Sequence, residues 1–174
     1  MYIVGIGGSP NPKSTSELVL RRALHEAERL GAETKIFAAN DLEFPLYAEG
    51  AVRTKDVLAF LHEIKRCTGL IICSPAYHGT ISGRIKNALD FIEDLKSSDP
   101  TYLDGRVIGC VAVGGGHLGA VLTVDALRTV AHALRAWPAP MGLGVSSQEP
   151  LSEKVDQKLF TIVGQVMRKT PVLQ

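Results

Sequence analysis

The chain has 174 residues, a formal net charge of +1, 45% hydrophobic residues and 21% charged residues. This length suits a single domain with a sizeable core, which we expect to cover residues 1–174. The near-neutral charge, without a basic run, argues against nucleic-acid binding through a charged face, and no apolar run is long enough to span a bilayer.

The first half of the chain alternates apolar runs with amphipathic runs. Tyr2–Ile6 is a β-branched apolar run, which predicts a buried strand. Apolar residues recur with helical spacing over Leu18–Leu30, and Gly31 is a natural end for that helix. The next expected elements are a strand at Glu33–Phe37, a loop at Asp41–Gly50 and a helix from Thr54 to about Lys65.

The second half continues the alternation. The apolar run Gly69–Cys73 predicts a third buried strand, and the amphipathic run Gly83–Leu95 predicts a helix. The remaining expected elements are a strand at Arg106–Val113, a helix at Leu118–Ala136, a weaker strand at Pro138–Val145 and a closing helix at Leu151–Lys169.

Strands that alternate with helices indicate a parallel sheet with helices on both faces. The pattern fits a three-layer α/β/α fold whose five-stranded parallel sheet has the order 2-1-3-4-5. In that order the switch point lies between the first and third strands, and open α/β sheets bind ligands there. The loops after the first, third and fourth strands should therefore meet at one edge of the sheet.

The loop after the first strand is rich in groups that can hold a phosphate. A helix N-terminus supplies free backbone N–H groups and a partial positive charge, and side chains add further donors. The spacing of the loop matches neither the nucleoside-triphosphate pattern nor G-x-G-x-x-G. The alternative is that Ser14 or Thr15 only caps the helix. The candidate phosphate ligands are Ser9, Asn11, Lys13, Ser14, Thr15 and Ser16.

The loops after the third and fourth strands fit a flat aromatic ligand. A flavin ring needs backbone donors along its polar edge and an apolar surface beneath it, and Tyr77 offers such a surface. The alternatives are an ordinary turn ahead of a helix capped by Ser82, and a flexible glycine loop without a ligand. The candidate ring contacts are Pro75, Ala76, Tyr77, His78, Gly79, Thr80, Gly114, Gly115, Gly116 and His117.

These motifs resemble the NAD(P)H-dependent FMN reductase family, a flavodoxin-like group that includes quinone and azo-dye reductases. The resemblance covers roughly residues 1–145. The motifs that carry it are Gly8–Asn11 with Ser14 and Ser16, Leu42–Tyr47, Ser74–Asp90 and Gly114–Gly116. The chain departs from the family at Asn11, where an arginine is usual, and at Ala76 and His78, where glutamate and asparagine are frequent. Loss of the arginine removes a bidentate phosphate partner, for which Lys13 is the nearest substitute.

The resemblance implies FMN as the cofactor and NADPH or NADH as the electron donor. Hydride would move from the nicotinamide to flavin N5 and then to a flavin, a quinone, an azo compound or a metal chelate. It also implies a homodimer or homotetramer, in agreement with the two apolar faces of the helix at Leu118–Ala136. We assign no catalytic acid or base and no metal ligand.

Two other functions stay open, namely a flavodoxin-type electron carrier and a flavin-free interaction module of the same fold. Such carriers tend to be strongly acidic, unlike this chain with its net charge of +1. An iron–sulfur flavoprotein is disfavoured because Cys67, Cys73 and Cys110 are scattered along the chain. An odd number of cysteines without a signal sequence indicates a cytoplasmic protein.

Overall fold

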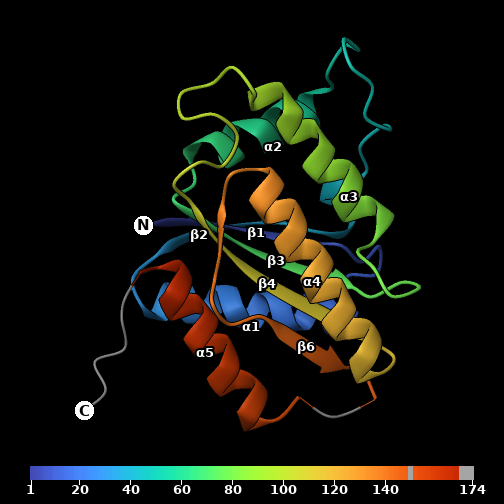
Figure 1. The fold of residues 1–174 in the computed structure, drawn as a ribbon, viewed down its shortest axis with the longest axis vertical. Helices are drawn as coiled ribbons and strands as arrows, with labels where there is room; N and C mark the ends of the chain where they lie inside the picture. Colours follow the sequence, from blue (N-terminus) through green and yellow to red (C-terminus); the bar gives the residue numbers. More distant parts are fainter. Residues whose placement is uncertain (149–150, 169–174) are drawn as a thin grey trace.

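The strands lie side by side in one parallel sheet, although helices separate them along the chain (Figure 1). The computed structural model describes residues 1–148 and 151–168. The strand order is β2-β1-β3-β4-β5, with β6 also paired to β4, so the predicted order 2-1-3-4-5 is confirmed. The strands are β1 (Tyr2–Gly7), β2 (Glu33–Phe37), β3 (Gly69–Pro75), β4 (Val107–Gly114), β5 (Trp137–Pro138) and β6 (Leu143–Ser146).

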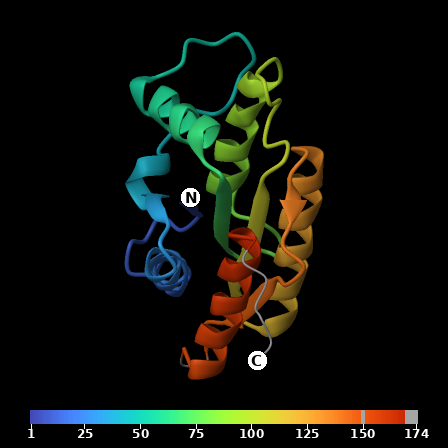
Figure 2. The ribbon, with the colours of Figure 1, turned by 90° about the vertical axis from the view of Figure 1, so that its left-hand side faces the viewer.

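Helices cover both faces of the sheet and give the expected α/β/α layers (Figures 1 and 2). On one face, α1 (Thr15–Arg29) and α5 (Glu153–Val166) bury their apolar sides in a core cluster that includes Ile71 of β3. The other face carries a second cluster, to which α2 (Lys55–Arg66), α3 (Gly83–Asp90) and α4 (His117–Ala133) contribute.

The register of the sheet aligns the ends of its central strands. Gly7 lies opposite Cys73 in the β1–β3 pair, and Cys73 lies opposite Val111 in the β3–β4 pair. The carboxyl ends of β1, β3 and β4 therefore meet at one edge, as the sequence predicts. The three loops that follow these strands emerge together from that edge.

Several element boundaries differ from the expected ones. The first helix begins at Thr15 rather than Leu18, because the hydroxyl of Ser14 caps it. The helix from Gly83 ends at Asp90 and continues as a 3₁₀ turn, η2 (Phe91–Leu95). A short 3₁₀ turn, η1 (Ala39–Leu42), overlaps the start of the expected loop at 41–50. The expected closing helix reached Lys169, which lies outside the described residues.

The fifth strand position is filled by two short strands. β5 pairs with Val107 and Ile108, and β6 pairs with the segment from Val111 to Gly114. Between them the chain contains Pro140, which lacks the N–H group needed for continuous pairing. The single strand expected at 138–145 is therefore wrong in its extent but correct in its place beside β4.

No helix in the described ranges is long and apolar enough to cross a membrane. The expectation of one domain over 1–174 stays a prediction, since it includes residues 149–150 and 169–174, which lie outside the described part of the chain.

Candidate functional site

A cavity of about 390 Å³ lies where the three loops meet. This volume falls within the range of about 300–1,000 Å³ that is usual for small-molecule and cofactor sites. The lining residues come from the ends of β3 and β4, the start of α1 and the loops after β1, β3, β4 and β6. They are Ser9, Ser14, Thr15, Ser16, Pro75, Ala76, Tyr77, Val113, Gly114, Gly115 and Ser147.

The start of α1 presents hydrogen-bond donors to this cavity. The Ser14 hydroxyl accepts from the N–H of Glu17 at 3.2 Å, and the Ser14 carbonyl accepts from the N–H of Leu18 at 3.0 Å. Among the described residues, the backbone N–H groups of Thr15 and Ser16 have no hydrogen-bond partner. Free amides at a helix N-terminus favour an anionic group. Two backbone N–H groups of this turn therefore stay available to a ligand after Ser14 has capped the helix.

The predicted ligands Asn11 and Lys13 do not line the cavity. Asn11 shapes the loop instead, since its side-chain oxygen accepts from the N–H of Lys13 at 2.9 Å and its carbonyl accepts from the N–H of Ser14 at 3.1 Å. Its own N–H donates to the hydroxyl of Ser9 at 3.1 Å. Both Asn11 and Lys13 are exposed, so the cavity lining itself contains no cationic side chain.

The second loop is held in place by two buried serines. The Ser74 hydroxyl accepts from the N–H of Ser82 at 3.0 Å and donates to the carbonyl of Pro75 at 2.8 Å. Ser82 also caps α3, as expected, and the N–H of Ala76 donates to the carbonyl of Val113 at 2.8 Å. These bonds fix Pro75 and Ala76 against the cavity.

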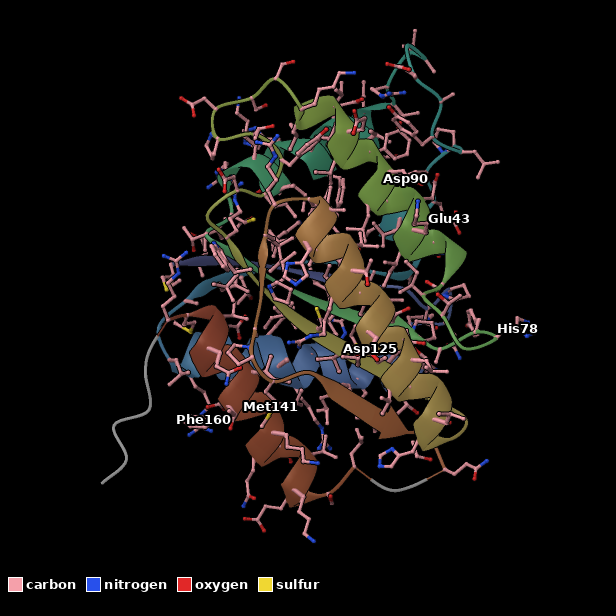
Figure 3. The ribbon with its side chains drawn as sticks, viewed as in Figure 1. Glu43, His78, Asp90, Asp125, Met141 and Phe160 are labelled. Carbon is pink, nitrogen blue, oxygen red and sulfur yellow. The ribbon has the colours of Figure 1, made fainter. Side chains whose placement is uncertain are left out.

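The tip of the second loop turns away from the cavity. Tyr77 and Thr80 form an isolated antiparallel bridge around His78 and Gly79, whose φ angles are 53° and 81°. Two successive residues with positive φ make a tight turn that carries the chain outward. Figure 3 shows His78 pointing into solvent at this tip. Tyr77 lines the cavity, whereas the predicted contacts His78, Gly79 and Thr80 do not.

The third loop leaves room at one glycine and is packed tightly at another. A Cβ on Gly114 would lie 3.0 Å from the carbonyl oxygen of Gly116 and 3.1 Å from the backbone nitrogen of Ala120. A Cβ on Gly115 would meet nothing within 4 Å, so this residue borders open space. Gly114 and Gly115 line the cavity, whereas the predicted contacts Gly116 and His117 lie beyond it.

Two lining residues were not among the predicted ones. Val113 is the next-to-last residue of β4. Ser147 directly follows β6, and its N–H donates to the carbonyl of Gly114 at 2.8 Å. The pairing of β6 with β4 therefore brings a fourth segment to the site. The sequence signal for this segment was the serine pair Ser146 and Ser147, which follows the apolar run 143–145.

A buried carboxylate lies beneath the first loop. Glu17 is 2% exposed, and its Oε1 lies 2.7 Å from Nη2 of Arg21. A Cβ on Gly7, the last residue of β1, would lie 3.2 Å from Oε2 of Glu17. Burial raises the pKa of the Cys73 thiol, and the Glu17 carboxylate raises this pKa further. The negative charge of Glu17 therefore acts at the carboxyl ends of β1 and β3.

Comparison with known proteins identifies the family. The model of the family described as NADPH-dependent FMN reductase matches residues 1–149. The chain belongs to this family. The resemblance seen in its loops is thereby confirmed, and so is the flavodoxin-like fold.

The relatives of this chain include iron–sulfur flavoproteins and FMN reductases. An iron–sulfur flavoprotein of Archaeoglobus fulgidus is 34% identical over 125 residues, which cover 67% of this chain and 64% of the relative. An FMN reductase (NADPH) of Escherichia coli is 30% identical over 142 residues, which cover 78% of this chain and 68% of the relative. The chain thus spans about two thirds of the length of these relatives.

Solved structures show the same fold over nearly the whole of this chain. An NADH:FMN oxidoreductase in its apo form superposes with a TM-score of 0.76 at 22% identity, covering 98% of this chain and 91% of that chain. The flavoenzyme NAD(P)H:acceptor oxidoreductase of Paracoccus denitrificans has a TM-score of 0.76 at 16% identity, with coverage of 96% and 97%.

The three cysteines of this family member do not form a cluster. Cys67 ends α2, whereas Cys73 and Cys110 lie within β3 and β4, and all three are free and buried. Within the described ranges no group of three or more His, Cys, Asp and Glu side chains could hold a metal ion.

The cavity lining combines two chemistries that fit FMN. The serine hydroxyls and the free amides of Thr15 and Ser16 suit a phosphate. The ring of Tyr77, the apolar side chain of Val113 and the open space beside Gly115 suit a flat ring. The lining contains no cation, so a phosphate would be held by hydrogen bonds and the helix terminus.

Proposed function

We propose that this chain is an NAD(P)H-dependent flavin reductase that binds FMN in the cavity after β1, β3 and β4. The observation that carries the proposal is that free amides at the start of α1 line the same cavity as the apolar side chain of Val113, the ring of Tyr77 and Gly115. The FMN reductases of Escherichia coli and Pseudomonas putida support this activity. Bound FMN would supply a ring that accepts hydride from NADPH or NADH.

The residues of the chain bind and orient in this proposal. Ser14, Thr15 and Ser16 hold the phosphate, and the backbone of Pro75 and Ala76 borders the ring. The lining includes no histidine, carboxylate or lysine, so we assign no proton transfer to a side chain. The proposed second substrates are flavins, quinones, azo compounds and metal chelates, and a relative named NADPH azoreductase supports the azo class.

The electron donor is proposed as NADH or NADPH without a strong preference. Recognition of a 2′-phosphate usually needs an available arginine. Arg53 is occupied, since Nε and Nη2 contact the two carboxylate oxygens of Asp94 at 2.6 and 2.8 Å. Arg84 donates to the carbonyl of Ala39 at 2.5 Å and lies 3.8 Å from Glu43. Neither arginine is therefore free to select NADPH.

A dimer through α4 is the second part of the proposal. Leu118, Val121 and Leu122 are 74%, 49% and 47% exposed on this helix, although its opposite side is buried against the sheet. Their position beside the third loop would place the partner near Gly115, which lines the cavity. Exposed apolar side chains that form one patch are typical of a protein interface. A cytoplasmic location is also proposed, supported by three free, buried cysteines.

Titration of FMN with the purified protein tests the cofactor, because a bound flavin ring usually loses fluorescence. We expect quenching, together with oxidation of NADH or NADPH when FMN, a quinone and a ferric chelate are offered in turn. FMN binding without nucleotide oxidation would favour the electron carrier. Absence of FMN binding at high micromolar protein would favour the flavin-free module and exclude the proposed reductase.

A further inference from the structure

Glu17 is a buried charge with one oxygen unused. Its side chain lies in the first turn of α1 and is 2% exposed. Oε1 pairs with Arg21, but Oε2 is buried and has no hydrogen-bond partner among the described residues. A buried carboxylate oxygen normally has a donor, since leaving it without one costs free energy.

The position of Glu17 sets its charge against a phosphate. The helix terminus and the free amides of Thr15 and Ser16 attract an anion to the cavity. Glu17 brings a negative charge into the same helical turn, with Oε2 next to the end of β1 at Gly7. A carboxylate there cancels part of the field that would attract a phosphate.

The neighbouring cations compensate for this charge only in part. The Arg21 side chain is 57% exposed, so solvent screens its charge, whereas the Glu17 side chain is 2% exposed. Lys13 is exposed on the loop and does not line the cavity. A Cβ on Gly7 would lie 3.2 Å from Oε2 of Glu17, and Gly7 lies opposite Cys73 of β3, so the carboxylate lies close to the carboxyl ends of β1 and β3.

We propose that Glu17 is a specificity-determining residue that weakens the hold of the first loop on the 5′-phosphate of a flavin. The site then binds FMN less tightly than its donors would allow, and riboflavin, which lacks the phosphate, competes more effectively. This inference rests on the proposed flavin site. It assigns Glu17 an electrostatic role without contact to the flavin.

The test compares the Kd values of FMN and riboflavin by fluorescence quenching in wild-type protein and in Glu17→Gln. This nearly isosteric change removes the charge, and we expect the preference for FMN over riboflavin to rise about tenfold. The matched control is Glu28→Gln, which removes a carboxylate from the far end of α1, where the side chain is 52% exposed. Glu28→Gln should leave the preference for FMN over riboflavin unchanged.

A second variant protects the test against failure of Glu17→Gln to fold. Arg21→Gln removes the partly screened cation that faces Glu17 and should lower the preference for FMN several-fold, because the carboxylate then lacks its partner. An unchanged preference in folded Glu17→Gln, or an unchanged preference in Arg21→Gln, would overturn the role of Glu17. Failure of wild-type protein to bind either flavin would instead reject the proposed function.

Discussion

Replacement of Gly8 by alanine should disturb both the fold and the site. A Cβ at this position would lie 2.4 Å from Oγ of Ser82 and 2.7 Å from Cδ1 and Cγ1 of Ile85. Both neighbours belong to the start of α3 and are fully or almost fully buried, so neither can move into solvent. Overpacking of this kind typically costs about 1–3 kcal/mol. We therefore expect Gly8→Ala to lower the free energy of unfolding by about that amount.

The effect should extend to the flavin. The N–H of Ser82 donates to Ser74, which in turn donates to the carbonyl of Pro75, so a displaced α3 displaces the second loop as well. Weaker quenching of FMN fluorescence by Gly8→Ala than by wild-type protein would report this change. Equal quenching would show that the second loop keeps its position despite the larger residue.

Urea unfolding followed by circular dichroism measures the stability of Gly8→Ala, and Gly83→Ala is its matched control. A Cβ on Gly83 would meet nothing within 4 Å, and the residue is the first of α3. The control should stay within about 0.5 kcal/mol of wild type. For a chain of this size, each kcal/mol corresponds to about 2–4 °C in Tm. Wild-type stability of Gly8→Ala would refute the packing argument.

Three further changes test the loop, the helix surface and the buried thiols. Ser14→Ala should weaken the binding of FMN about tenfold more than the binding of riboflavin, because it removes a hydrogen bond to the charged phosphate. Equal weakening of both ligands would show that the loop only caps α1. Leu122→Glu places a charge on the exposed side of α4 and should reduce the mass measured by light scattering to that of a monomer; a persistent dimer would contradict the proposed interface. Burial raises the pKa of Cys67 to about 11, so the stability that this protonated thiol contributes should be complete below about pH 9 and decline as pH rises towards 11. Unfolding in urea across this range checks the decline, with Cys67→Ala as the variant that should lack this contribution.

The order of the elements could be predicted because each strand is a short apolar run and each helix has regular apolar spacing. The ends of the elements were harder to predict, because they depend on single contacts. The start of α1 moved to Thr15 because the Ser14 hydroxyl caps the helix. Pro140 was a local signal for the interruption between β5 and β6, but the sequence does not show that both segments pair with β4.

The site was predicted at the level of loops rather than side chains. The hydroxyl-rich turn and the glycines indicated where a ligand would bind, because the strand order brings these loops together. The direction of individual side chains depended on backbone angles, as at His78, where a positive φ starts the turn that faces solvent. Ser147 was missed because its position requires knowledge of β6, and the burial of Glu17 was missed because acidic residues in a first helical turn are usually exposed.

The divided edge of the sheet beside β4 also limits how copies of the chain can associate. β5 has only two residues, one of them Pro138, and β6 has four. Such short segments expose few backbone N–H and C=O groups in a row, and proline offers no N–H at all. A strand from another molecule therefore finds no long template here on which to continue the sheet. Association on this side of the molecule is left to helix surfaces such as α4, and the interrupted edge protects the chain against uncontrolled growth by strand addition.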